Sequence, residues 1–249
     1  MKKLSLATSV LAALTIVLTA VGALLGTAYD MASDQTLYAS QSRKAVAQQF
    51  GFADDAQITA YIGLTEEEQE DAATRIALYM AYASEDQELD LPVLGERERQ
   101  HMRDVRGLIR LAQGGYKLCM ALAAGLAVAI AWTGARLRHR HRAALAGAAC
   151  GAGVLIIGAL GLMLAMNTMG FERLFVGLHR LAFTNDLWLM DPQTEILIRM
   201  MPQALFEQAF GALLLRAAAV FGIALVMLAA VYAVISGMIH RNVSEREKA

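Results

Sequence analysis

The sequence predicts an all-α membrane protein with four transmembrane helices and a small, mainly helical extracytoplasmic cap. Three observations predict this class. Apolar residues make up 57% of the 249 residues, and the mean hydropathy is +0.42, which is high for a soluble domain of this length. Four apolar runs reach the ~20 residues that a helix needs to cross a bilayer. The segments between the runs show helical spacing of apolar residues rather than strand-like alternation.

The predicted spans cover residues 1–28, 111–134, 143–168 and 211–239. The first run has an alternative, a cleaved signal peptide, because Gly26 and Ala28 have the small side chains of a cleavage site. Its apolar stretch exceeds the ~7–15 residues of a signal core, so we expect a retained span. Cys119 and Cys150 lie inside spans, where we expect them to pack as small apolar residues.

Basic residues predict the orientation of the spans. They stand at the start of the first span, as Lys2 and Lys3 before its apolar run, fill the loop 135–142 and recur in the tail 240–249. These three regions must share one side of the membrane, and the positive-inside rule makes that side the cytoplasm. Both termini are therefore predicted to be cytoplasmic, and the segments 29–110 and 169–210 to be extracytoplasmic. The formal net charge of −1 offers no basic field for a nucleic acid.

The first extracytoplasmic segment has two helix signals. Thr65 followed by Glu68 is a capping-box pair at the start of a one-sided apolar pattern. After a loop that ends near Gly95, a second helix is predicted to begin at about Glu96 and to continue unbroken into the second span. This part of the chain is therefore predicted to form a small helical cap.

The second extracytoplasmic segment begins with an apolar helical stripe that leaves the third span. A turn follows that contains Trp188, a residue suited to the membrane interface because its ring is apolar and its N–H is polar. A short amphipathic stretch, broken near Pro202, then leads to the fourth span, and we expect it to lie in the interface.

Two histidines are candidates for chemistry. Of five histidines, only His101 and His179 lie in the extracytoplasmic segments, each beside an apolar stripe and near a carboxylate, Asp104 or Asp186. Imidazole can both accept and donate a proton near neutral pH. The pattern alone leaves two alternatives open, which are ordinary surface histidines at helix borders and a zinc site built from these four residues. The sequence contains no nucleophile elbow, phosphate loop or dinucleotide fingerprint.

Two motifs resemble the bacterial lipoprotein intramolecular transacylases. They are ERERQHMRDVRGLI at 96–109 and FVGLHRLAFTNDLWLMDPQTEILIRMMPQALF at 175–206, and YIGLTEEE is similar to the segment that precedes the first motif. The resemblance covers the four-span layout and both motifs, and is weak from about 30 to 60. Leu178 departs from the pattern, because an aromatic residue is expected before the second histidine.

The resemblance implies an activity and its substrate. The substrate would be a bacterial lipoprotein whose N-terminal cysteine carries a diacylglyceryl thioether and a free α-amine. The enzyme would move the sn-2 acyl chain onto that amine, which gives an N-acyl lyso-lipoprotein, with His101 and His179 as the catalytic residues. Conversion of an ester into an amide is downhill, so neither a cofactor nor a metal is expected. The resemblance also implies a multi-pass protein of the bacterial cell membrane, with its active site extracytoplasmic.

The two imidazoles would divide the roles of general base and oxyanion stabiliser, and the sequence does not assign them. Asp104 and Asp186 are candidates to orient them, and Asn185 to donate to the oxyanion, with helix or turn capping as the alternative for each. Further candidates for contact with substrate or lipid phosphates are Arg103, Arg106 and Trp188. The expected partners are the diacylglyceryl-modified N-terminus and membrane lipids.

Two alternatives to the transacylase stay open at this point. The first is a metal-dependent membrane hydrolase built on the same histidines. The second is a non-catalytic membrane receptor or assembly factor that uses the cap as a docking surface.

Overall fold

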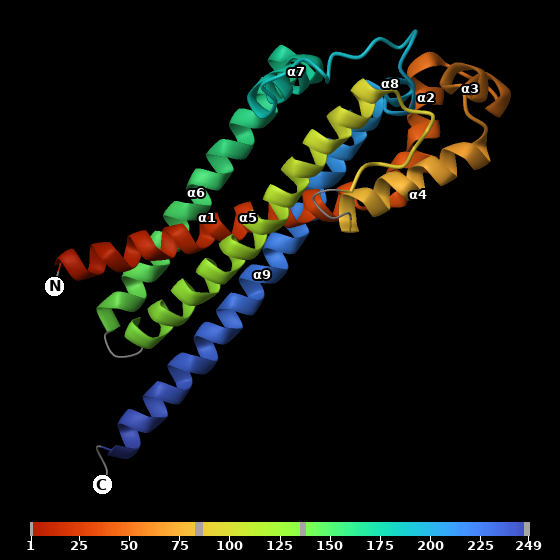
Figure 1. The fold of residues 1–249 in the computed structure, drawn as a ribbon. Helices are drawn as coiled ribbons and strands as arrows, with labels where there is room; N and C mark the ends of the chain where they lie inside the picture. The colour runs from red at the N-terminus through yellow and green to blue at the C-terminus, as the bar shows by residue number, and fades with distance from the viewer. Residues whose placement is uncertain (1, 83–86, 135–137, 247–249) are drawn as a thin grey trace. The chain divides into compact units, whose positions relative to one another are not determined.

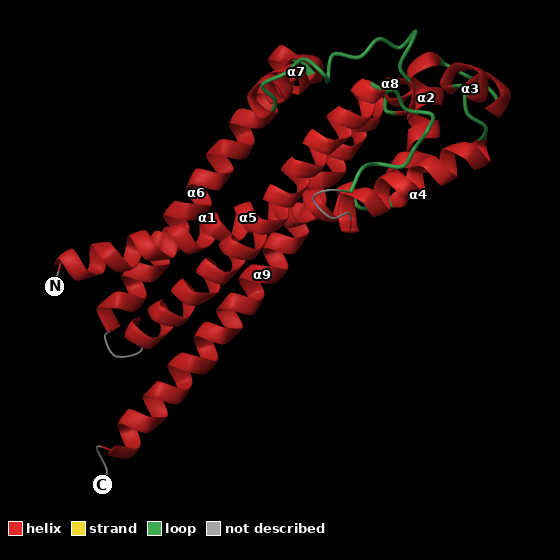
Figure 2. Ribbon diagram, viewed as in Figure 1, coloured by secondary structure: helices red, strands yellow, loops and turns green. Residues whose placement is uncertain are grey.

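The computed structural model describes residues 2–82, 87–134 and 138–246, and every regular element in these ranges is a helix (Figures 1 and 2). Parts of the predicted loop before Gly95, of the basic loop and of the tail, at 83–86, 135–137 and 247–249, lie outside the described residues. So do the side chains of the basic residues at 2–3, 138–141 and 240–246.

Among the described residues, four helices are long and apolar enough to cross a membrane, which confirms the predicted fold class. They are α1 (Lys2–Ala32), α5 (Glu96–Gly134), α6 (Arg138–Met169) and α9 (Gln203–Arg246). The remaining elements are η1 (Leu37–Gln41), α2 (Ser42–Phe50), α3 (Asp55–Ile62), α4 (Glu66–Tyr82), α7 (Phe171–Ala182) and α8 (Ile196–Met200). The chain divides into two compact units, which are described separately below.

The first unit is the membrane unit, formed by Met1–Gly26, Gly114–Asn167 and Arg216–Ala249. Many of its large apolar side chains are exposed, with Ile157 at 73% and Val226 at 71%. Exposed apolar surface on this scale is what a lipid environment requires of a helix.

Helices α1 and α6 of the membrane unit approach each other closely. Ser9 Oγ donates a hydrogen bond to the carbonyl oxygen of Ala143 at 2.7 Å. A Cβ atom on Gly147 would collide with the Ser9 backbone, and one on Gly151 would lie 2.9 Å from the oxygen of Ala13. Small residues at these positions therefore serve close helix packing.

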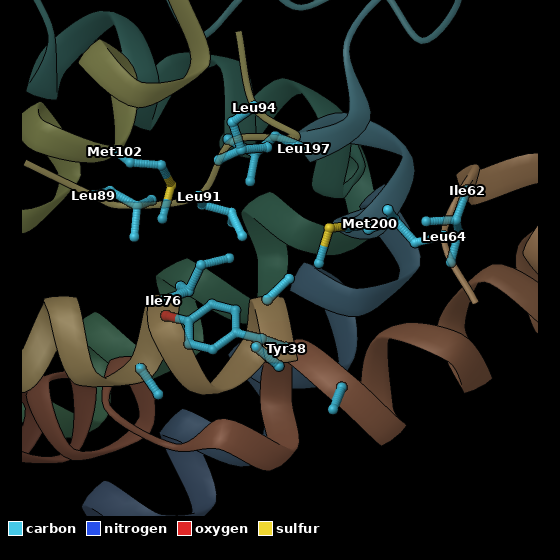
Figure 3. Close-up of a cluster of buried hydrophobic side chains, with 14 of the residues drawn as sticks. Tyr38, Ile62, Leu64, Ile76, Leu89, Leu91, Leu94, Met102, Leu197 and Met200 are labelled. Atoms are coloured by element: carbon cyan, nitrogen blue, oxygen red, sulfur yellow. The ribbon is translucent and has the colours of Figure 1, made fainter. Parts of the chain in front are cut away.

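The second unit is the cap unit, formed by Thr27–Gln113 and Thr168–Leu215, and it has its own hydrophobic core (Figure 3). The most deeply buried members include Ile62 of α3, Ile76 of α4 and Met200 of α8, all at 0% exposure.

The start of α4 confirms the predicted capping box. Thr65 N donates to Glu68 Oε2 at 2.8 Å and Glu68 N donates to Thr65 Oγ1 at 3.2 Å. The hydrogen bonds from Thr65 lower the pKa of the Glu68 carboxyl.

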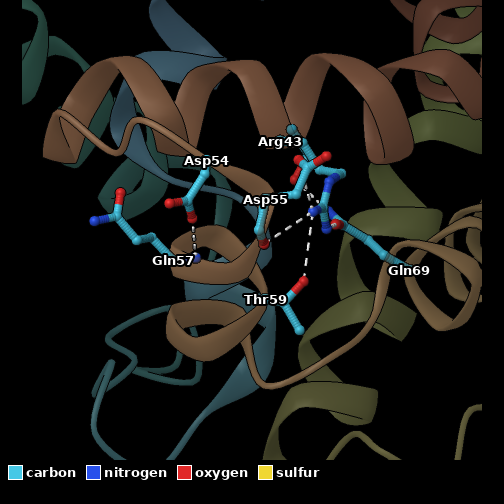
Figure 4. A network of polar contacts seen from close by, with 7 residues as sticks. Arg43, Asp54, Asp55, Gln57, Thr59 and Gln69 are labelled. Carbon is cyan, nitrogen blue, oxygen red and sulfur yellow. Dashed lines mark hydrogen bonds and ion pairs between the residues drawn. The ribbon is translucent and has the colours of Figure 1, made fainter.

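A polar network joins four helices of the cap unit, and Figure 4 shows the part of it around Arg43. Arg43, which is 7% exposed, donates to Gln69 Oε1 and to Asp55 Oδ1, each at 3.1 Å. Gln69 Nε2 in turn donates to Ser42 Oγ at 2.8 Å, and Ser42 Oγ donates to the carbonyl oxygen of Met200. The network thereby links α2, α3 and α4 to α8, which lies within the second motif.

Candidate active site

The N-terminal turns of α5 position His101 against the cap core. Met102 is 3% exposed, and Val105 and Ile109 pack against the core cluster, so the predicted apolar stripe is confirmed. His101 is 7% exposed and is therefore not a surface histidine. Many residues between Glu96 and Arg110 are charged, so these first turns of α5 do not belong to the apolar stretch that could cross a membrane.

Helix α7 positions His179, which is half-buried. The Nδ1 atom of His179 lies 2.8 Å from the carbonyl oxygen of Phe175, one helical turn earlier. A carbonyl oxygen only accepts, so Nδ1 carries the hydrogen and Nε2 is left with a lone pair. The Phe175 ring lies 4.1 Å from the imidazole and 5.1 Å from the ring of Phe206, measured between centroids. The orientation of His179 is thus set by a main-chain acceptor and an aromatic contact.

The structure brings the two histidines together. Their ring centroids are 6.4 Å apart and the ring planes differ by 25°. Phe183 contacts both rings, at 5.2 Å from His101 and 5.6 Å from His179. Trp188, which the sequence placed at the interface, lies 5.1 Å from His179. Two imidazoles enclosed by aromatic rings can therefore act on atoms of a single small group.

Burial governs the charge of His101. The pKa of His101 is lowered from 6.5 to about 4: desolvation by burial is the largest cause, the nearby His179 adds to the lowering, and Asp104 opposes it. His101 is therefore neutral at pH 7. Its Nδ1 atom is buried and has no hydrogen-bond partner among the residues that the structure describes. Buried polar atoms are normally satisfied, so an open ring nitrogen here is a group that a substrate could satisfy.

Asp104 and Asp186 do not orient the histidines as predicted. Asp104 Oδ2 accepts a hydrogen bond from Asn185 Nδ2 at 2.9 Å, and Asn185 Oδ1 accepts from Leu187 N at 3.1 Å. No hydrogen bond joins either carboxylate to a histidine within the described ranges: Asp104 is paired with Asn185, and the partner of His179 Nδ1 is a backbone carbonyl. Asp104 acts on His101 through its charge alone and fixes the amide of Asn185 in place.

Arg97, which sequence reasoning missed, holds the turn after α7. Its Nη2 atom donates to the carbonyl oxygens of Asp186 at 2.6 Å and Leu189 at 2.9 Å. Arg97, His101 and Asp104 follow one another at i, i+4 and i+7, so they share one face of α5. The turn is therefore fixed to α5 on both sides of His101, by Arg97 at one end and Asp104 at the other. The sequence signal that could have identified Arg97 is its position four residues before His101, one helical turn away on the same face.

Glu98, also missed, holds the start of α8. The side chain is 2% exposed, and its two oxygens accept from Gly95 N at 2.6 Å and from Leu197 N at 2.7 Å. The first contact is half of a capping box at the start of α5. The second crosses to Leu197 within the second motif, so one carboxylate holds the start of α5 and the start of α8.

The two predicted arginines bind the loop before α5 rather than the histidine pair. Arg103 donates to Glu88 Oε1 at 2.8 Å. Arg106 is 4% exposed, donates to the carbonyl oxygen of Gln87 at 3.0 Å, and stacks 4.5 Å above the Tyr79 ring. Arg106 is buried because its guanidinium stacks on Tyr79, and this burial does not fit the predicted contact with lipid phosphates.

A pocket of about 360 Å³ adjoins the histidine pair. It is lined by Val176, Arg180, Phe183, Thr184, Asn185, Asp186, Trp188 and Leu189. Phe183 and Trp188 contribute to both the pocket and the histidine enclosure. Among the described residues, no three His, Cys, Asp or Glu side chains are grouped as a metal site.

The fold and the site together define the class of this protein, which is a multi-pass membrane protein with two facing histidines. The family model described as lipoprotein intramolecular transacylase Lit matches residues 37–206, and the chain belongs to this family.

Solved structures share the fold. The chain is 20% identical to the integral membrane transacylase Lit from Bacillus cereus, with a TM-score of 0.64 and 100% of both chains covered. Two variants of that protein, in which a histidine is changed to arginine or to alanine, give TM-scores of 0.61 and 0.60 at 20% identity. The match to the arginine variant covers 97% of this chain and 96% of that variant. The match to the alanine variant covers 100% of this chain and 97% of that variant. No curated protein matches the sequence.

Proposed function

We propose that this chain moves the sn-2 acyl chain of a diacylglyceryl-cysteine onto the α-amine of the same cysteine, with His101 and His179 as the catalytic residues. Family membership supports a lipoprotein transacylase. The observation that carries the catalytic assignment is the facing pair of imidazoles, 6.4 Å apart. The basic segments predicted to be cytoplasmic support an extracytoplasmic reaction, on the side where lipoproteins display this cysteine.

The reaction needs proton transfer and positioning. The amine nitrogen attacks the ester carbonyl carbon, a C–N bond forms, and the C–O bond to glycerol breaks. One proton leaves the nitrogen and one reaches the glycerol oxygen, so the reaction is balanced without a co-reactant. Donor and acceptor belong to one molecule, so holding them in an attack geometry supplies up to about 7–11 kcal/mol of the barrier.

His179 is the proposed general base and proton shuttle. Its Nδ1–H is engaged by the carbonyl oxygen of Phe175, so Nε2 is the nitrogen that accepts the proton of the attacking amine. The same nitrogen then returns the proton to the departing glycerol oxygen.

His101 is the proposed stabiliser of the carbonyl oxygen. Burial keeps its imidazole neutral at pH 7, and a neutral imidazole N–H can polarise a carbonyl without placing a second cation beside His179. Asn185, held by Asp104, keeps one amide hydrogen for the same oxygen.

The test is mass spectrometry of lipoprotein N-termini in a host that otherwise leaves the cysteine amine free. Cells with the wild-type chain should make N-acyl lyso-lipoprotein, and His101→Gln and His179→Gln should each lower its yield at least 100-fold. The matched controls are Gln100→Ala and Arg173→Ala, at exposed positions on the same two helices, which should leave the yield unchanged.

Two results would reject the proposal. Normal product from both folded histidine variants would remove the catalytic assignment and favour a docking role. Activity of the purified protein that disappears with EDTA and returns with zinc would favour the metal-dependent alternative.

A further inference from the structure

The pocket beside the histidine pair has unused charged groups. Arg180 and Asp186 both line it. Within the described residues, neither side chain forms an ion pair or a hydrogen bond, and the two are not paired with each other. The Thr184 hydroxyl lies in the same lining. The pocket thus offers a cation, an anion and a neutral polar group to a ligand.

The wall of this pocket is fixed in advance. Asn185 is held by Asp104, and the carbonyl oxygens of Asp186 and Leu189 are held by Arg97. None of these bonds uses the Asp186 carboxylate. The backbone of this turn is thus ordered before a ligand binds, and the Arg180 and Asp186 side chains, which have no partner among the described residues, are available to a ligand.

Four of the eight lining residues are apolar, so it is the charged side chains that discriminate between the parts of the substrate. Hydrocarbon placed against an unpaired guanidinium and carboxylate would strip them of water without replacing the lost hydrogen bonds. A peptide presents N–H and C=O groups at every residue, which match a carboxylate and a guanidinium respectively. Phe183 and Trp188 form the boundary between the pocket and the imidazoles, so a chain in the pocket would adjoin the reacting cysteine.

We propose that this pocket binds the peptide residues that follow the lipidated cysteine, with Arg180 donating hydrogen bonds to their carbonyl oxygens and Asp186 accepting hydrogen bonds from their N–H groups. The inference rests on the proposed function and names the part of the substrate that determines its affinity. Arg180 and Asp186 touch no reacting atom in this arrangement, so they act on substrate affinity and not on the chemical step.

The experiment compares two synthetic substrates of the full-length protein in detergent micelles. One is S-diacylglyceryl-cysteine methylamide, and the other carries four neutral residues after the cysteine. Arg180→Ala should raise KM for the extended substrate about 5-fold, leave KM for the short substrate unchanged, and leave kcat unchanged for both. Arg180→Lys, which keeps the charge, should recover most of the affinity, and Arg173→Ala on the same helix should change nothing.

Each other outcome overturns the inference in a different way. Equal rises in KM for both substrates would assign Arg180 to the cysteine or the lipid. A rise that occurs only when anionic phospholipid is added to the micelles would assign it to a headgroup. No change for either substrate would leave the pocket without a role in binding. If the wild type converts neither substrate, the proposed function itself fails.

Discussion

Replacing Glu98 tests how firmly the segment with the second motif is held to α5. The carboxylate is 2% exposed and accepts two backbone N–H bonds, at 2.6 Å from Gly95 and 2.7 Å from Leu197. In Glu98→Gln the amide oxygen can accept only one of them, and the amide NH₂ then faces the other donor. The loss is largest where the Leu197 N–H, which is buried, is left without an acceptor: Glu98→Gln should cost about 1–2 kcal/mol, and Glu98→Ala, which removes the acceptor of both N–H groups, about 2–3 kcal/mol.

The matched control is Glu96→Gln, two residues earlier on the same helix. Glu96 is 72% exposed on its side chain and pairs with Arg99 at 3.0 Å, so its loss should cost less than about 0.5 kcal/mol. Equilibrium unfolding in detergent, followed by Trp fluorescence and circular dichroism, gives the free energies of unfolding. The reasoning is refuted if Glu98→Gln is no more destabilised than Glu96→Gln.

Three further predictions follow from the same structure. The lowered pKa of His101 means that its contribution to stability is complete above pH 6.5 and is lost as the pH falls through about 4; NMR of labelled histidine, with His101→Gln for assignment, should therefore show no titration of this ring above pH 5.5, and a midpoint above 6 would contradict it. Gly147→Ala should destabilise the membrane unit by about 1–3 kcal/mol through overpacking, whereas Gly153→Ala, with nothing within 4 Å, should be neutral or stabilising in thermal unfolding. Alanine variants of Asp104 and Asn185, alone and together, should show a coupling of about 0.5–1 kcal/mol in a double-mutant cycle, and strict additivity would mean that their hydrogen bond contributes nothing.

The membrane helices and the capping of α4 were predictable because each depends on local sequence. Hydropathy over a run of residues suffices for a span, and Thr65 with Glu68 suffices for a cap. The helices α2 and α3 were not predicted. They have nine and eight residues, too few to be stable alone, and they depend on tertiary contacts such as the buried Arg43.

The histidine pair was predictable from its pattern and its motifs, whereas the contacts that fix it were not. Arg97 binds carbonyl oxygens, and the position of a carbonyl depends on the conformation of a turn rather than on residue identity. The predicted carboxylate partners failed for the same reason, because spacing along one helix cannot reveal that Asp104 meets Asn185 from a distant segment. The contact of Glu98 with Leu197 could not be predicted for the same reason, because the two residues are far apart in the sequence.

The acceptor that orients His179 has a consequence for how the site tolerates mutation. In many histidine-dependent enzymes that acceptor is an aspartate, and one base change in its codon can remove it. Here it is the main-chain oxygen of Phe175, which every amino acid supplies. No side-chain substitution at that position can delete the hydrogen bond, so alanine scanning would overlook it. Only a change that breaks the helix itself, such as a proline introduced within this turn of α7, would release the ring.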